Sequence, residues 1–94
     1  MALYIMLTRL TDAGAETINK HPERIKQVNQ ELEGLGAKVL AQYATLGQYD
    51  FVNVVEAADN ATIAHVSAEL AMRGSVRIQT LPAMPIEEFI AKFK

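Results

Sequence analysis

The chain has 94 residues, of which 50% are hydrophobic and 21% are charged, and its net charge is −2. This length predicts one domain over residues 1–94, and this composition is typical of an ordered protein with a modest core. The sequence contains no cysteine, no basic cluster, no apolar run of membrane-spanning length and no secretory leader, so we expect a cytoplasmic protein without disulfides, thiolate metal sites, nucleic-acid partners or membrane partners.

The N-terminal part of the chain predicts a strand followed by two helical segments. Leu3–Leu7 is apolar at consecutive positions, which is typical of a strand that is buried on both faces. Thr11 or Asp12 is expected to cap a short helix that runs through Asn19. Pro22 suits the first turn of a longer helix. The apolar residues of this longer helix recur at helical spacing, namely Ile25, Val28, Leu32 and Leu35.

A β-hairpin is predicted in the middle of the chain. Val39–Leu46 and Phe51–Glu56 are rich in β-branched and aromatic residues, which favours two antiparallel strands. In the connecting turn, Gly47 can take a positive φ and Asp50 can accept hydrogen bonds from nearby backbone amides. Two interpretations of Tyr49 and Asp50 remain open. They hold the turn and the end of the sheet, or they form a small polar site there.

The C-terminal part predicts a helix, a strand and a short tail helix. Asp59 or Asn60 is expected to cap the first helix, and Val76–Leu81 to form the last strand. Pro82 is expected to end that strand, and Pro85–Phe93 to form a short amphipathic helix. The buried residues of the first helix are expected to be Ile63, Val66 and Leu70. The apolar positions of the tail are Ile86, Phe89, Ile90 and Phe93.

This order of elements, β-α-β-β-α-β with a tail helix, predicts an α+β protein of the ferredoxin-like class. Right-handed crossovers place the first strand beside the third. We therefore expect a four-stranded antiparallel sheet with the spatial order four-one-three-two and with the helices on one face.

The face of the sheet that the helices leave open is expected to be apolar. In the first strand both alternating sets are largely apolar, Leu3, Ile5 and Leu7 on one side and Tyr4, Met6 and Thr8 on the other. Whichever set faces the helices, an uncovered apolar surface remains, and such a surface predicts a protein contact. Two sheets packed face to face would form a homo-oligomer with a shared interior.

Candidate ligand-binding residues follow from the same alternation. Val76 and Ile78 belong against the helices, which places Arg77 and Gln79 on the open face. Convergent polar groups in an apolar cavity are typical of a small-molecule site. The further candidates for this site are Asn53, Tyr43, Gln42 and Tyr4. The alternative interpretation makes Arg77 and Gln79 rim residues at a subunit edge.

The chain resembles the GYD domain family. The motif that carries this resemblance is Gly47-Gln48-Tyr49-Asp50 followed by Phe51 and Val52, placed between the two strands of the hairpin. The resemblance spans nearly the whole chain. It implies a ferredoxin-like fold of the dimeric α+β barrel type, and it implies no catalytic residue or cofactor.

Two functional hypotheses follow. The first is a non-enzymatic oligomeric domain that binds a small ligand or acts as a scaffold. The second is a cofactor-independent small-molecule enzyme, for which the titratable candidates are Tyr43, Tyr49, Asp50, His65 and Arg77. These candidates show no spacing typical of a nucleophile, base and acid. His65 is expected to be solvated, because its helix offers no second ligand at metal-binding spacing, and no metal site is predicted.

Overall fold

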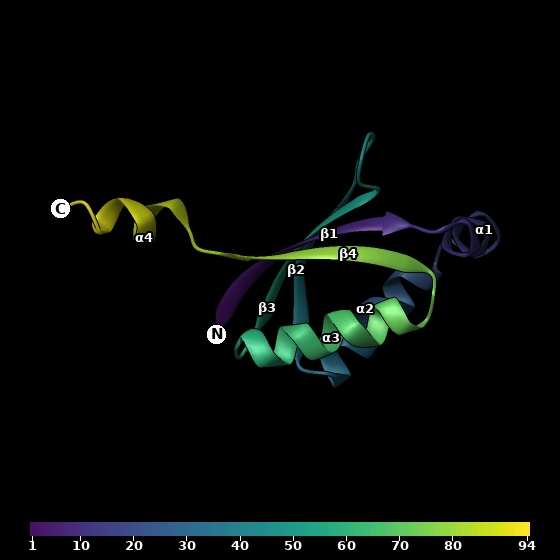
Figure 1. The fold of residues 1–94 in the computed structure, drawn as a ribbon, viewed down its shortest axis with the longest axis horizontal. Coiled ribbons are helices and arrows are strands. Elements are labelled where there is room, and N and C mark those ends of the chain that lie inside the picture. Colours follow the sequence, from purple (N-terminus) through teal and green to yellow (C-terminus); the bar gives the residue numbers. More distant parts are fainter.

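One antiparallel sheet with the strand order β2-β3-β1-β4 organises the protein, in a computed structural model that describes residues 1–94. The elements are β1 (Ala2–Leu10), α1 (Asp12–Lys20), α2 (Arg24–Gly34), β2 (Ala37–Ala44), β3 (Phe51–Ala57), α3 (Asn60–Met72), β4 (Val76–Ala83) and α4 (Ile86–Ala91). Helices α2 and α3 cover one face of the sheet, and α1 lies at one end of it (Figure 1). The ferredoxin-like fold and the strand order that the sequence predicts are confirmed.

The core lies between the sheet and the helices α2 and α3. In the pairing of β1 with β3, Tyr4 lies opposite Val55 and Met6 lies opposite Asn53, and all four side chains face the helices. The buried apolar residues are Tyr4, Met6, Leu32, Ala37, Val55, Ala57, Ile63, Val66 and Leu70. The apolar stripe predicted for α3 is therefore the part of this helix that packs on the sheet.

Side-chain caps fix where α1 and α3 begin. Thr11 Oγ1 accepts a hydrogen bond of 3.2 Å from the Gly14 amide and donates one of 2.6 Å to the Gly74 carbonyl. Asp59 Oδ1 accepts hydrogen bonds from the amide and the hydroxyl of Thr62, at 2.9 and 2.8 Å. Each of these oxygens satisfies an amide that has no partner inside its helix.

The predicted bounds of two strands are wrong. The second strand begins earlier than Val39 and ends at Ala44. The last strand continues through Pro82, which pairs with Tyr4, and ends at Ala83. Strand β4 lies at the edge of the sheet, where a proline is tolerated because its nitrogen can point away from the ladder.

A β-bulge in β2 changes which side chains face the helices. Val39 pairs with Val55, but the next paired residue of β2 is Ala41, opposite Val54. Strict alternation from Val39 would place Tyr43 on the helix side and Gln42 on the open side. Because Leu40 is the extra residue, Gln42 lies opposite Asn53 on the helix side instead.

The tail helix α4 lies beyond the end of the sheet and away from the other helices (Figure 1). All of its residues are exposed. Its Phe89 forms an edge-on pair with Phe93, which follows the helix, and the two ring centroids are 5.1 Å apart. No helix of the protein has the length and apolar character needed to cross a lipid bilayer.

Candidate functional site

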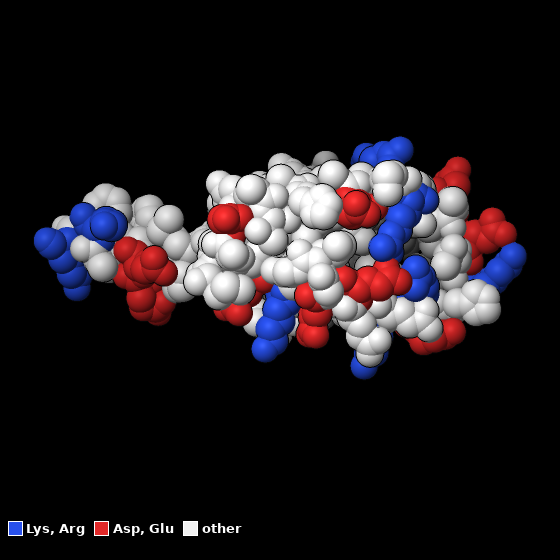
Figure 2. Space-filling view, turned by 90° about the horizontal axis from the view of Figure 1, so that it is seen from below, with Lys and Arg blue, Asp and Glu red and all other residues white.

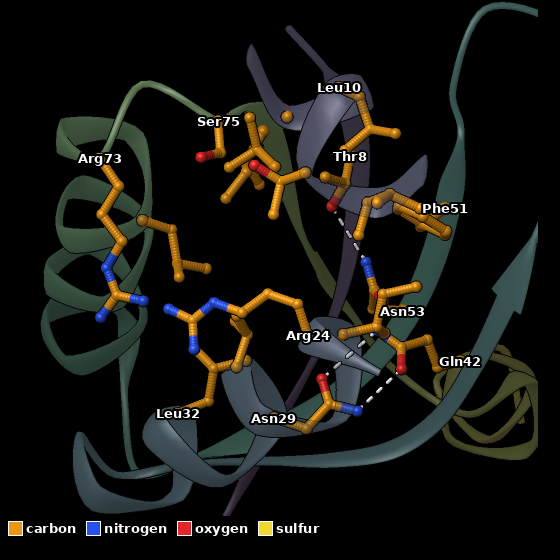
Figure 3. Close-up of a pocket in the computed structure, with 18 residues that line it drawn as sticks. Thr8, Leu10, Arg24, Asn29, Leu32, Gln42, Phe51, Asn53, Arg73 and Ser75 are labelled. Atoms are coloured by element: carbon orange, nitrogen blue, oxygen red, sulfur yellow. Dashed lines mark hydrogen bonds between the residues drawn. The ribbon is translucent and has the colours of Figure 1, made fainter. Parts of the chain in front are cut away.

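A cavity of about 140 Å³ lies between the sheet and the three helices α1, α2 and α3, and we call it the helix-side pocket. Its apolar wall consists of Leu10, Ile18, Ile25, Val28, Leu32, Phe51, Leu70, Val76 and Ile78. Its polar lining comprises Thr8, Thr17, Arg24, Asn29, Gln42, Asn53, Arg73 and Ser75. Figure 3 shows the two arginines on one side of the pocket and Thr8, Phe51 and Asn53 on the opposite side. An apolar cavity with a few grouped polar side chains is the usual form of a small-molecule site.

The sheet side of the pocket is closed by a network of side-chain amides. Asn53 is 7% exposed, and its Nδ2 donates to the Met6 carbonyl at 2.8 Å and to Thr8 Oγ1 at 3.1 Å. Asn53 Oδ1 accepts a hydrogen bond of 2.8 Å from Gln42 Nε2. Gln42 Oε1 in turn accepts a hydrogen bond of 2.8 Å from Asn29 Nδ2. No buried side-chain nitrogen or oxygen of the protein lacks a partner, so this network is complete without a ligand.

Two arginines and one glutamate stand at the solvent side of the pocket. Arg24 Nη1 lies 3.1 Å from Glu31 Oε1, and Arg73 Nη1 binds Glu31 Oε2. The hydrogen bond from Arg73 is the main cause that lowers the pKa of Glu31, and Arg24 acts in the same direction. All three side chains are between 35% and 37% exposed, so the cluster carries two positive charges and one negative charge where the pocket meets solvent.

The open face of the sheet is apolar along its centre, as predicted. Its partly exposed residues come from three strands, namely Leu3, Ile5, Leu7, Val52, Val54 and Leu81. Opposite this surface, the helix side of the molecule carries acidic and basic residues interspersed with one another, without a large area of one sign (Figure 2).

Arg77, Gln79 and Tyr43 lie on the open face, at its edges. Arg77 pairs directly with Arg9 across β4 and β1. These two arginines line a shallow hollow of about 170 Å³ together with Gln48, Tyr49, Ile78 and Gln79. The expected positions of Arg77 and Gln79 are correct, and their role in ligand binding stays a prediction.

The expectation that Asn53 joins Arg77 on the open face is wrong, and of the two alternatives Gln42 and Tyr43 only Tyr43 lies there. The register of β1 with β3 puts Asn53 on the face that the helices cover, and the bulge in β2 puts Gln42 there too. Tyr4 is also on that face, where it is 1% exposed and donates a hydrogen bond of 2.6 Å to Asn60 Oδ1. Asn53 and Arg77 are therefore on opposite faces of the sheet and share no pocket.

The turn motif holds the end of the sheet. Gly47 has φ of 115°, a conformation that other residues rarely adopt. The Asp50 carboxylate accepts a hydrogen bond of 2.8 Å from the Leu10 amide, and the Tyr49 carbonyl accepts one of 2.7 Å from Thr45 Oγ1. Tyr49 OH donates to Gln79 Oε1 on the open face.

Of the titratable residues considered for an enzyme, only Tyr49 and Arg77 line a common hollow. The His65 side chain is 60% exposed, and its Nε2 lies 3.4 Å from Glu69 Oε1 on the same helix, away from the turn motif. Sequence reasoning missed Arg24, Asn29, Glu31 and Arg73 as site residues. No local pattern marks this cluster, because Arg73 at the end of α3 joins the three residues of α2 only through the packing of the two helices.

Comparison with known proteins agrees with this fold. The chain is 59% identical over 95 residues to the "Glutamine synthetase and cystathionine beta-lyase binding protein" of Thermus thermophilus, and the match covers 100% of both chains. The fold is similar to the crystal structure of TTHA0845, also from Thermus thermophilus, with a TM-score of 0.57 and 23% identity. That match covers 90% of this chain and 95% of the other.

The model of the GYD domain family matches residues 4–92. This range contains the Gly47-Gln48-Tyr49-Asp50 motif, all four helices and nearly all of the sheet. The chain belongs to the GYD domain family.

Proposed function

We propose that this protein is a non-enzymatic binding module whose partners are enzymes of the two kinds in the name of its relative, glutamine synthetase and cystathionine β-lyase. The observation that carries the proposal is the 59% identity over the full length of both chains. The positions of the titratable residues favour binding over catalysis, since His65 lies on α3 and is separate from Tyr49 in the turn and from Arg77 on β4.

The tail helix α4 is the element that we assign to partner binding. The apolar residues of α4 and of the turn after it are Ile86, Phe89, Ile90 and Phe93. They follow the spacing i, i+3, i+4 and i+7, which is the spacing of helices that insert into a groove of another protein. These side chains are between 45% and 76% exposed. A helix of this length is marginal in water by itself, so it gains stability when its apolar side is covered.

The test is calorimetric titration of the purified protein with purified glutamine synthetase and with purified cystathionine β-lyase. Both enzymes are taken from the organism to which this chain belongs. We expect saturable binding to at least one of these enzymes. The variant Phe89→Ser should weaken binding by at least about tenfold, since a buried aromatic anchor contributes about 2 kcal/mol or more. The control Glu87→Ser, on the same helix, should bind as the unchanged protein does. Absence of heat and of complex formation with both enzymes would refute the proposal.

We further propose that a second copy of this chain covers the open face of the sheet. Leu3, Ile5 and Leu7 leave an apolar strip along β1 that no element of the same chain covers. In such an assembly Arg77 and Gln79 are rim residues. Light scattering at micromolar concentration should give a mass above the 10.3 kDa of one chain, and Ile5→Glu should reduce that mass to the value of one chain. A mass of one chain for the unchanged protein would exclude the assembly.

A further inference from the structure

We propose that the helix-side pocket binds a small amphipathic carboxylate, with its hydrocarbon body inside the cavity and its carboxylate between Arg24 and Arg73. This inference concerns a site that partner binding through α4 does not use, and it stands independently of the proposed function. It rests on the charge at the mouth of the pocket, the chemistry of its interior and its size.

The mouth of the pocket has unused capacity for one carboxylate. Each guanidinium group carries five N–H donors in a planar fork that matches a carboxylate. The side chain of Arg73 donates only to Glu31, and that of Arg24 donates to Glu31 and to Gln27. Glu31 already shows that a carboxylate fits against both guanidinium groups. Because two cations face one anion, a second carboxylate makes the cluster neutral.

The interior of the helix-side pocket favours a ligand with a hydrocarbon body. Side chains from all three helices and the sheet enclose the cavity, among them Ile18, Val28, Leu70 and Ile78. The amide network of Asn53 is complete, so the sheet side of the pocket offers no unpaired polar group that a second polar end of a ligand would satisfy. A ligand with one charged end and one apolar end therefore fits better than a sugar or a dianion.

The size of the cavity limits the body to about six carbon atoms. An apolar protein cavity of about 150 Å³ stays dry and accepts a molecule of the size of benzene. The helix-side pocket has about 140 Å³. Short unbranched, branched or aromatic monocarboxylates are of this size, and hexanoate is a suitable probe.

The experiment is a titration of the ¹⁵N-labelled protein with sodium hexanoate, followed by ¹H–¹⁵N correlation spectra. We expect saturable shifts for amides of α1, of α2 and of the C-terminal end of α3. Hexan-1-ol, which keeps the body and lacks the charge, and acetate, which keeps the charge and lacks the body, should each bind at least about tenfold more weakly. Equal affinity for hexanoate and hexan-1-ol would overturn the role of the arginines. Shifts confined to Arg9, Arg77 and their neighbours would overturn the location.

Variants of the charged residues test the mouth of the pocket. Arg73→Gln and Arg24→Gln should each weaken hexanoate binding by about tenfold, while the control Lys26→Gln removes the same charge from an exposed position of α2 and should change nothing. Arg73→Lys keeps the charge and loses the planar fork, so it should also weaken hexanoate binding. It replaces Arg73→Gln in the experiment if that variant does not fold. Glu31→Gln should strengthen binding by about threefold, because it removes the competing carboxylate.

A cavity-filling variant checks the interior. Val28→Phe leaves both arginines in place and puts a ring into the cavity, so it should abolish the hexanoate shifts while the protein stays folded by the same spectrum. Undiminished binding to this variant would place the ligand elsewhere. Phe89→Ser should bind hexanoate normally, so failure of the ligand site and failure of partner binding through α4 give different results.

Discussion

Asp50 fastens the start of β3 to the end of β1, because its carboxylate accepts a hydrogen bond of 2.8 Å from the Leu10 amide. The backbone supports the same junction, since the Asp50 amide donates to the Thr8 carbonyl at 2.8 Å. This pair of bonds connects the Gly-x-Tyr-Asp turn to the central strand of the sheet. The arrangement favours the structural interpretation of the motif over a separate polar site.

We therefore expect Asp50→Ala to lower the free energy of unfolding by about 1.5–3 kcal/mol, which is the usual loss for a hydrogen bond to a charged group. Asp50→Asn keeps one acceptor oxygen and should lower the melting temperature by less. Arg77→Ala, on the open face, should change the unfolding free energy by less than about 0.5 kcal/mol. Denaturant unfolding measures all three, and the reverse order of effects would show that the turn motif is not structural.

Asn53 should be the most sensitive polar residue of the protein. Asn53→Ala removes the hydrogen bonds to Gln42 Nε2, Thr8 Oγ1 and the Met6 carbonyl, and the expected loss is about 1–3 kcal/mol. The matched control is Asn19→Ala, which removes an exposed side chain that bonds only to the Ala15 carbonyl of its own helix. Thermal unfolding followed by circular dichroism compares the two variants. Equal melting temperatures would mean that the amide network contributes nothing to stability.

Two glycine-to-alanine variants should have opposite effects. A Cβ atom on Gly14 would lie 2.0 Å from the Ser75 carbonyl oxygen, so Gly14→Ala must displace α1 from the start of β4 and should lower stability. A Cβ atom on Gly34, near the end of α2, meets no atom within 4 Å. Gly34→Ala should therefore raise stability by about 0.4–1 kcal/mol through the unfolded chain. Chemical denaturation tests both variants. A Gly14→Ala protein that is as stable as the unchanged protein would contradict the close packing of α1.

The cap of α3 should give a contribution to stability that depends on pH. The Thr62 amide and the Thr62 hydroxyl donate hydrogen bonds to the Asp59 carboxyl and lower its pKa, and the bond from the amide has the larger effect. A carboxyl whose pKa is lower in the folded state stabilises the fold above its unfolded pKa, about 3.9, and loses this contribution as the pH falls through the folded value. The melting temperatures of the unchanged protein and of Asp59→Ala should therefore differ at pH 7 and begin to converge only as the pH falls below about 4. A difference that grows on acidification would have the wrong sign.

Local patterns in the sequence were enough to predict the order of the elements, the strand order of the sheet and the residues of α3 that pack against it. These features follow from local periodicity and from the handedness of β-α-β crossovers, which do not depend on distant contacts. The alternation of Val76, Arg77, Ile78 and Gln79 likewise fixed the two faces of β4, because only one of its alternating sets is apolar.

The faces of β1, β2 and β3 that the helices cover could not be predicted from local patterns and depend on the packing of the whole chain. Both alternating sets of β1 are largely apolar, so the sequence allowed either orientation, and the bulge after Val39 reversed the alternation in β2. For these two reasons Asn53 and Gln42 line the helix-side pocket and do not lie on the open face, where Asn53 was expected and Gln42 was one of two alternatives. Arg24 and Arg73 meet at Glu31 through the packing of α2 and α3, a contact between distant residues that no local pattern specifies.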